Sequence, residues 1–463
     1  MTPSSDRVAP VSPTLSRDAS AVATDFKPLL TKAGLFYFVF VMYSYTTGGC
    51  FGLEEQVTNS GPGLTLIYHL VVPFFWCIPV SLVAAELTTA MPVQGGFYRW
   101  VRAGFGDFWG FLAGWWNWTA SFLLGSAYAV LFTDYLGFYF PQITGWKHYL
   151  VSIALVAVIT YINVRGIKMV GRVSTVLEIF IFLPIVAMTA IGLAHSEHNP
   201  FVPLVPPHRP VFQVFGVGLA LGLWLYSGYE QLSTVAEEVE NPRRNYPLAL
   251  ALVVPMSMAT YFLPTFASLA ALNNWQDWHA GYFSTAASLI GGPWLGGWMT
   301  MAAMLANVAL LNSTVLASTR MPFAMAQDGF LTPALTKTHR RFGTPAISIL
   351  VSGAIYALLA VHSLTQLITV YVWLRIATTV MTVLAAWRLR KTKPEMARPF
   401  VIPGGRKGLI YAVGAPLLMG AVALLGSDRF ALLWGPFAIA LGPAAYFVLR
   451  GRFNLAHPTG SGG

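Results

Sequence analysis

Hydrophobic residues in this 463-residue chain form long runs that are separated by short charged or Pro/Gly-rich loops. The runs number about twelve, and each is near the roughly 20 residues that cross a bilayer as a helix. None shows the alternating pattern of membrane barrel strands. We therefore expect an all-α membrane protein with transmembrane helices over residues 34–60, 64–90, 104–137, 148–165, 170–194, 211–239, 247–272, 284–320, 345–361, 364–387, 409–425 and 431–449. The run at 284–320 is long, so we expect that helix to tilt strongly or to extend past the bilayer.

The first run is interrupted by a glycine-rich stretch that two carboxylates follow, reading Thr47-Gly48-Gly49-Cys50-Phe51-Gly52-Leu53-Glu54-Glu55. Each glycine inside a helix costs about 1 kcal/mol relative to alanine. Acidic residues at membrane depth are costly and usually functional. Irregular backbone at that depth is tolerated only where it lines a cavity or is buried in protein. The stretch therefore predicts unwound backbone beside a binding site.

The sixth run has a similar interruption, reading Tyr226-Ser227-Gly228-Tyr229-Glu230. A packing kink would also explain one such interruption, because small residues are common where membrane helices touch. Interruptions in corresponding spans of two halves are the best sequence indication of a transporter's binding site. We therefore predict that both interruptions line one site, with residues 47–52, Glu54 and residues 226–230 as candidate substrate-binding residues.

Composition and charge support a membrane protein and orient it. Hydrophobic residues make up 56% of the chain and charged residues 10%, whereas soluble proteins carry about 25% charged residues. The net charge of +10 does not indicate nucleic-acid binding, because 24 of the 28 Lys and Arg fall on one side of the predicted spans. Three fall on the other side (Lys147, Arg209 and Arg429), and Arg375 lies within a span. This positive-inside bias predicts that both termini are cytoplasmic.

The two ends of the chain differ from the apolar middle. Residues 1–26 are rich in Ser, Pro, Asp and Ala and are expected to form a disordered cytosolic tail without a cleavable signal peptide. A transporter domain is expected over residues 27–453, followed by a tail over residues 454–463. Cys50 and Cys77 lie within predicted spans, so no extracellular disulfide is expected.

These motifs resemble the amino acid–polyamine–organocation (APC) permease superfamily. The likeness rests on the two broken spans and on two loop motifs, Ala84-Ala85-Glu86-Leu87 and Glu237-Glu238-Val239-Glu240-Asn241-Pro242-Arg243-Arg244. Within the superfamily the first break is most similar to the polyamine-uptake and L-type amino acid transporter branch, where Gly-Gly-Pro-Phe-Gly-Ile-Glu is usual. Two positions depart from the pattern. Cys50 replaces the proline, and Ile181 stands where proton-coupled bacterial relatives have a lysine.

The resemblance implies inverted five-helix repeats with discontinuous first and sixth helices, as in the LeuT-like fold. It implies a secondary active transporter of the plasma membrane (the cell inner membrane) that works by alternating access, and not an enzyme. The acids Glu54 and Glu230 favour a cationic amine, meaning a polyamine or a basic amino acid, with proton coupling or exchange. A neutral L-amino acid permease and a substrate sensor built on a transporter fold are the alternatives.

No cofactor, metal ion or disulfide-linked partner subunit is expected. The nine histidines fall mainly in loops and form no His-Glu-x-x-His motif. The loop before the fourth span, residues 141–148, has no cysteine with which a partner subunit could form a disulfide. The expected partners are a small-molecule substrate and the lipid bilayer.

Four further polar residues lie within the predicted spans. Glu178 in the fifth span is a candidate for carrying a coupling proton, and a structural acid is the alternative. Arg375 in the tenth span either neutralises a site carboxylate, closes a gate or forms a simple interior ion pair. Asn117 hydrogen-bonds either substrate or a neighbouring helix. Glu86 is expected to anchor a loop at the cytoplasmic end of its helix.

Overall fold

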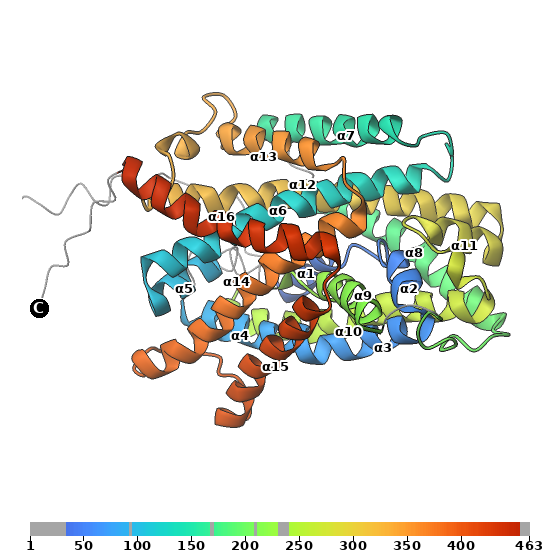
Figure 1. The fold of residues 1–463 in the computed structure, drawn as a ribbon, viewed down its shortest axis with the longest axis horizontal. Coiled ribbons are helices and arrows are strands. Elements are labelled where there is room, and N and C mark those ends of the chain that lie inside the picture. The colour runs from blue at the N-terminus through green and yellow to red at the C-terminus, as the bar shows by residue number, and fades with distance from the viewer. Residues whose placement is uncertain (1–33, 92–94, 167–170, 208–210, 230–239, 454–463) are drawn as a thin grey trace, which may run out of the picture.

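The computed structural model describes residues 34–91, 95–166, 171–207, 211–229 and 240–453, and all regular elements within these ranges are helical. Figure 1 shows their arrangement. In chain order they are α1 (Leu35–Thr46), α2 (Glu54–Ser60), α3 (Pro62–Val72), η1 (Pro73–Cys77), α4 (Ile78–Ala90), α5 (Gly96–Phe105), α6 (Asp107–Leu136), α7 (Trp146–Arg165), α8 (Gly171–Ala194), α9 (Val211–Leu225), α10 (Pro242–Ala271), η3 (Trp275–Asp277), α11 (Tyr282–Gly291), α12 (Pro293–Gln327), η4 (Pro333–Thr336), α13 (Ala346–Leu359), α14 (Leu364–Thr392), α15 (Gly405–Leu425) and α16 (Arg429–Phe453).

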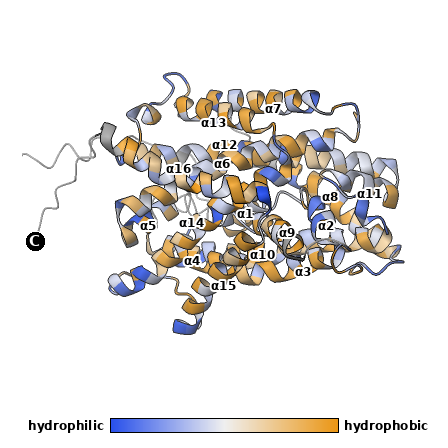
Figure 2. Cartoon of the chain, viewed as in Figure 1, coloured by the Kyte–Doolittle hydropathy of each residue, from blue (hydrophilic) through white to orange (hydrophobic). Residues whose placement is uncertain are grey.

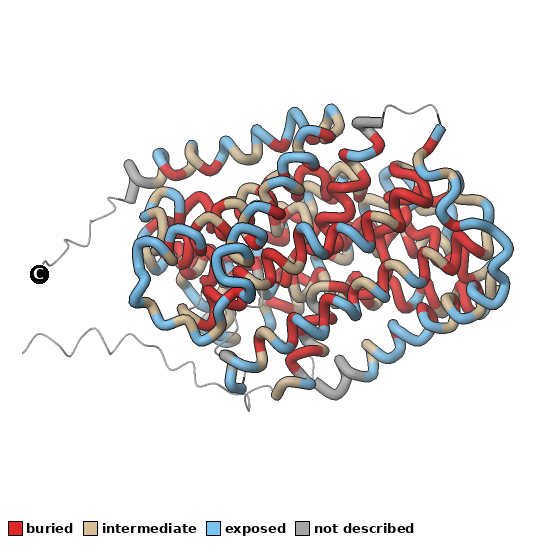
Figure 3. The backbone as a smooth tube through the Cα atoms, turned by 90° about the horizontal axis from the view of Figure 1, so that it is seen from below, coloured by how far each residue is buried: buried red, intermediate tan, exposed pale blue. Residues whose placement is uncertain are grey.

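Three long helices form the centre of the bundle. Helix α6 packs against both α12 and α14, and α12 also packs against α8 and α11. Helices α7 and α13 lie side by side at one edge, whereas α15 lies at the opposite edge against α4 and α14 (Figure 1). Buried positions concentrate inside this bundle and exposed positions lie on its outer helices (Figure 3). Helix α1 packs mainly against α10, α2 packs against α9, and α9 packs against the central helix α14.

The outer helices present apolar side chains. Eight helices within the described residues are long and apolar enough to cross a membrane, and α9 and α13 are shorter apolar helices. Large residues such as Leu358, Leu418 and Phe437 are exposed. Figure 2 shows hydrophobic residues along the outer helices. Exposing so much apolar surface to water would be costly, at about 25 cal/mol per Å², so this surface suits lipid.

The structure corrects one expected span. We expected residues 284–320 to be one long helix, but the chain bends at Gly292 and forms two helices, α11 and α12. Gly292 adopts a φ of +89°, which favours glycine. Pro293 follows as the first residue of α12, a position where its missing N–H leaves no helical hydrogen bond unmade. The expected helix at 64–90 has one π-helical turn, Pro73–Cys77, between α3 and α4.

Candidate functional site

The first break joins α1 to α2 through residues 47–53, which are not helical. Gly49 has a φ of +97°, and a Cβ atom there would lie 2.7 Å from the ring of Phe51. Gly52 has a φ of +92°, and a Cβ atom there would lie 2.7 Å from the ring of Trp224 in α9. Both the backbone conformation and the lack of space therefore require glycine at these two positions. The first span is therefore interrupted at the position that the glycine-rich stretch predicted.

The acids after this break bind neighbouring elements. Glu54 is fully buried, and its carboxylate accepts hydrogen bonds from the N–H of Gly52, at 2.8 Å, and from the hydroxyl of Tyr135 in α6. Glu55 accepts a hydrogen bond from the hydroxyl of Thr365 in the first turn of α14. The two carboxylates thus connect α2 to two different helices. The contact of Glu54 with substrate stays a prediction, because Glu54 is not among the residues that line the central cavity.

The second break follows α9 and is held by a hydrogen bond to α3 and another from η1. The hydroxyl of Tyr226 donates to the carbonyl of His69 at 2.8 Å. The indole of Trp76 donates to the hydroxyl of Ser227 at 3.0 Å. These bonds hold the side chains of Tyr226 and Ser227, the first two residues of the break, inside the bundle, where an unmade hydrogen bond would be costly. Glu230, the acid predicted to follow this break, lies outside the described residues.

A central cavity lies between the two breaks and has a volume of about 60 Å³. The first break lines it with Thr47 and Phe51, and the second break lines it with Ser227 and Gly228. The structure therefore brings both interruptions to one cavity. The cavity has room for only a few water molecules, so a larger ligand requires the lining to move apart.

The remaining predicted residues of the breaks lie beside this lining and not within it. They shape the two breaks without contributing to the cavity surface: Gly48, Gly49, Cys50, Gly52, Tyr226 and Tyr229. All of these are buried. Their candidate role in binding stays a prediction. Their position beside the cavity favours a role in shaping the breaks.

Helix α12 contributes polar lining that our sequence analysis missed. Asn307, Thr314 and Ser318 line the cavity, and their spacing by seven and four residues places them on one helical face. That spacing of polar residues in an apolar run was the available sequence signal. The Asn307 side chain donates through Nδ2 to the carbonyl of Ala303 at 2.9 Å, while its buried Oδ1 accepts no hydrogen bond. This oxygen is therefore an acceptor for a ligand N–H group.

Two of the lone polar residues of the predicted spans meet beside the cavity. Asn117 of α6 lines the cavity, and its Oδ1 accepts a hydrogen bond at 3.1 Å from Nη1 of Arg375 in α14. Arg375 is 2% exposed. Glu178 of α8 accepts a hydrogen bond from Ser44 of α1, before the first break. Coupling or gating by Glu178 and Arg375 stays a prediction.

Charged clusters join the helices at the end of the bundle where α6 begins. Asp328, directly after α12, accepts from Arg99 and Arg102 of α5, each at 2.9 Å, and from the hydroxyl of Tyr98 at 2.5 Å. Arg102 also donates to Asp107 at the start of α6, at 2.6 Å. These contacts link α5, α6 and α12.

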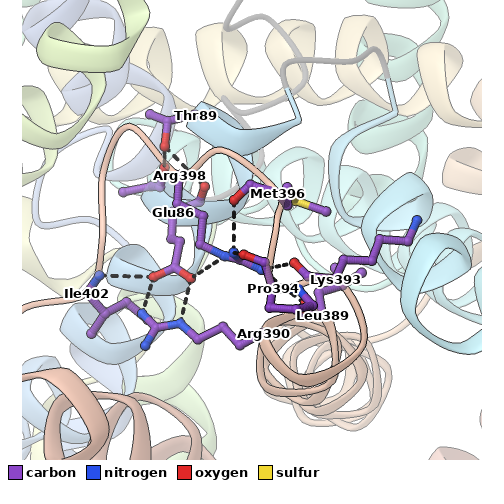
Figure 4. Close-up of polar contacts among 10 residues, drawn as sticks. Glu86, Thr89, Leu389, Arg390, Lys393, Pro394, Met396, Arg398 and Ile402 are labelled. Carbon is purple, nitrogen blue, oxygen red and sulfur yellow. Dashed lines mark hydrogen bonds and ion pairs between the residues drawn. The ribbon is translucent and has the colours of Figure 1, made fainter.

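Glu86 of α4 holds a second cluster at the same end (Figure 4). Its buried carboxylate accepts from Nε of Arg390 at 2.8 Å and from the backbone N–H of Ile402 at 2.9 Å, and Nε of Arg398 lies 3.6 Å away. Arg390 lies in the last turn of α14, and Ile402 and Arg398 belong to the loop that leads to α15. The prediction that Glu86 anchors a loop is confirmed.

The described residues contain no group of three His, Cys, Asp or Glu side chains that could hold a metal ion. Cys50 and Cys77 are buried free thiols.

Comparison with known proteins agrees with a site for a small solute. Residues 34–446 match the model of the amino acid permease family. The chain therefore belongs to this family of transporters, as its motifs predicted.

The relatives are named as transporters. A probable polyamine transporter of Arabidopsis thaliana is 32% identical over 87% of this chain and 83% of its own length. The polyamine transporter PUT1 of Oryza sativa subsp. japonica is 32% identical over 90% of this chain and 78% of its own length. An uncharacterized transporter of Legionella pneumophila is 29% identical over 76% of this chain and 81% of its own length. The chain is thus a multi-pass membrane transporter and not an enzyme.

Proposed function

We propose that the chain is a secondary active transporter that moves a cationic amine, either a polyamine or a basic amino acid, across the plasma membrane by alternating access. The observation that carries this proposal is the central cavity between the two broken helices. Unwound backbone at such a cavity presents unpaired N–H and carbonyl groups to a solute. The transported amine moves together with a proton or in exchange for another solute.

The proposed architecture has about twelve transmembrane helices in two inverted five-helix repeats, with both termini in the cytoplasm. The breaks after α1 and α9 are the expected corresponding positions of the two repeats. The distribution of Lys and Arg supports the orientation. It places the clusters around Asp328 and Glu86 inside the cell and Glu55 on the outer side. A cytosolic tail, residues 1–26, precedes the transporter domain, and a second tail, residues 454–463, follows it.

The substrate class rests on acceptor groups and on the predicted acids. The hydroxyls of Thr47 and Ser227 and the unpaired Oδ1 of Asn307 offer oxygen atoms to ammonium N–H groups. Glu54 and Glu230 would add negative charge near the two breaks. Two of the relatives are named polyamine transporters, which supports the same class.

A neutral L-amino acid is the second candidate substrate, and one observation favours it. Among the described residues, those lining the central cavity carry no charged side chain. The N–H groups freed in the first break suit a carboxylate, as helix ends do. A polyamine has no carboxylate and would leave these donors to water. The uncharged lining therefore supports a zwitterionic substrate.

A ligand panel on purified protein tests the proposal. Thermal shift should show stabilisation by putrescine, spermidine, arginine or lysine, because a ligand that binds only the folded state raises its stability. Proteoliposomes should then accumulate the radiolabelled form of the stabilising compound. Stabilisation by neutral amino acids alone would overturn the cationic substrate and leave the family assignment standing. Stabilisation without accumulation would indicate a sensor.

A further inference from the structure

A second cavity, here called the outer cavity, lies at the end of α6 that carries Asp134. Its volume is about 740 Å³, against about 60 Å³ for the central cavity. Pockets that hold small molecules usually measure about 300–1,000 Å³. The outer cavity is bounded by α2, α6, α7, the segment before α11 and the segment between α13 and α14. In this structure the outer cavity, unlike the central one, has room for an extended diamine.

The outer cavity carries acids and imidazoles. Its titratable lining consists of Glu55 from α2, Asp134 from α6, His148 from α7, His279 before α11 and His362 before α14. Neither Lys nor Arg lines it among the described residues. The imidazole of His148 lies 2.8 Å from the carboxylate of Asp134. A lining with two carboxylates and neither Lys nor Arg attracts a cation.

The two cavities have lining elements in common. The residues around the first break border both cavities, with Phe51 at the central cavity and Glu55 at the outer cavity. Helix α6 likewise borders both cavities, with Asp134 at the outer one. The ring of Phe51 packs edge-on against Tyr135 of α6, at a centroid distance of 5.3 Å. Tyr135 also donates to Glu54. A solute in the outer cavity thus lies beside the same elements that line the central cavity.

We propose that the outer cavity is a second substrate site, which binds an ammonium group of a cationic amine at Glu55 and Asp134 before the amine enters the central cavity. The proposal rests on the proposed function and adds the place where the amine is first held. The carboxylates accept the ammonium hydrogen bonds, and the open volume holds the alkyl chain.

The test is the concentration dependence of spermidine uptake into proteoliposomes that contain the full chain. Glu55→Gln and Asp134→Asn should each raise the KM by about fivefold, the upper range for a partly exposed ion pair, with kcat little changed. Asp277→Asn is the matched control, because Asp277 is an exposed acid two residues from His279 that does not line the cavity. This control should leave the KM unchanged.

A third variant separates charge from structure. Thr365→Val removes the hydrogen bond to Glu55 but keeps the carboxylate, so it should raise the KM by less than Glu55→Gln does. Asp134→Asn keeps the test decisive if the Glu55 variant fails to fold. If Asp277→Asn raises the KM as much as the two acid variants do, the acids only attract cations to this face in general, and the outer site is overturned. Unchanged KM values for both acid variants would overturn the outer site while spermidine transport stands. If the wild-type protein transports no cationic amine, the proposed function fails and the outer site falls with it.

Discussion

Glu54→Gln tests whether the buried acid after the first break binds substrate or shapes the break. In the structure its carboxylate accepts from the Gly52 N–H and from the Tyr135 hydroxyl. A glutamine side chain has the same length but offers one oxygen and one NH2 group. Of the two donors, the Gly52 N–H and the Tyr135 hydroxyl, only one then keeps an oxygen acceptor in the same geometry. Since Glu54 is fully buried, water does not replace the lost partner.

The expected cost follows from these two hydrogen bonds. A hydrogen bond to a charged group contributes about 1.5–3 kcal/mol, and a neutral one about 1 kcal/mol. Losing one charge-assisted bond and weakening the other to a neutral one should therefore lower the free energy of unfolding by about 2–5 kcal/mol. Because the bonds hold the unwound backbone, the loss should weaken uptake of every substrate. If Glu54 instead contacts an amine, the loss is about ten- to hundred-fold for a diamine and smaller for a neutral amino acid.

The assay pairs uptake in proteoliposomes with thermal unfolding of the purified variants. Tyr135→Phe is the matched control, because it removes the same hydrogen bond and keeps the carboxylate. If both variants act through this bond, the effect of the double variant will be smaller than the sum of the single effects. A selective loss of polyamine uptake in Glu54→Gln, with normal thermal stability and no effect of Tyr135→Phe, would refute the structural role.

Three further outcomes are expected. Gly49→Leu should abolish uptake, because a Cβ atom there would lie 2.7 Å from the Phe51 ring; normal binding in this variant would contradict the observed break. Cysteine labelling should find residue 148 accessible from outside and residue 243 from inside, and the reverse pattern would invert the proposed topology. Glu86→Gln should lower stability by about 1.5–3 kcal/mol, since the buried carboxylate loses a charge-assisted hydrogen bond to a partly exposed arginine; an unchanged melting temperature would show that the Glu86 cluster of Figure 4 is not stabilising.

Features that depend on local backbone chemistry could be predicted from the sequence. The breaks were predictable because several glycines at membrane depth disfavour a helix whatever surrounds them. The anchoring role of Glu86 was predictable because an acid at a helix end near basic loops has few other partners. The break between α11 and α12 was not predicted, although Gly292 and Pro293 mark it. The run of hydrophobic residues continues across these two positions, and its continuity favoured one long helix.

Features that depend on which helices meet could not be predicted in the same way. The sequence places Glu54 near the site, but the neighbouring Tyr135 belongs to α6, about eighty positions later in the chain. Its carboxylate is therefore turned toward a helix whose position only the tertiary structure supplies. The same holds for Asp328, whose partners lie in α5. Asn307 lies between these two cases. Its spacing from Thr314 and Ser318 could predict a polar face of the helix, but the cavity that this face lines could not be predicted.

A cationic substrate raises one physical question, namely which charges balance it. The described lining of the central cavity is uncharged, and Arg375 lies behind Asn117. Counter-charge then has to act from behind the lining. Two unit charges about 8 Å apart at an effective dielectric constant of about 20 interact by about 2 kcal/mol, which is tenfold or more in affinity. Glu54, one residue layer behind Phe51, can supply such an interaction without touching the amine. Its hydrogen bonds to Gly52 and Tyr135 shape the break while its charge sets the field in the cavity, so removing the charge should weaken uptake of cationic substrates more than that of neutral ones, in addition to the general loss of uptake and stability.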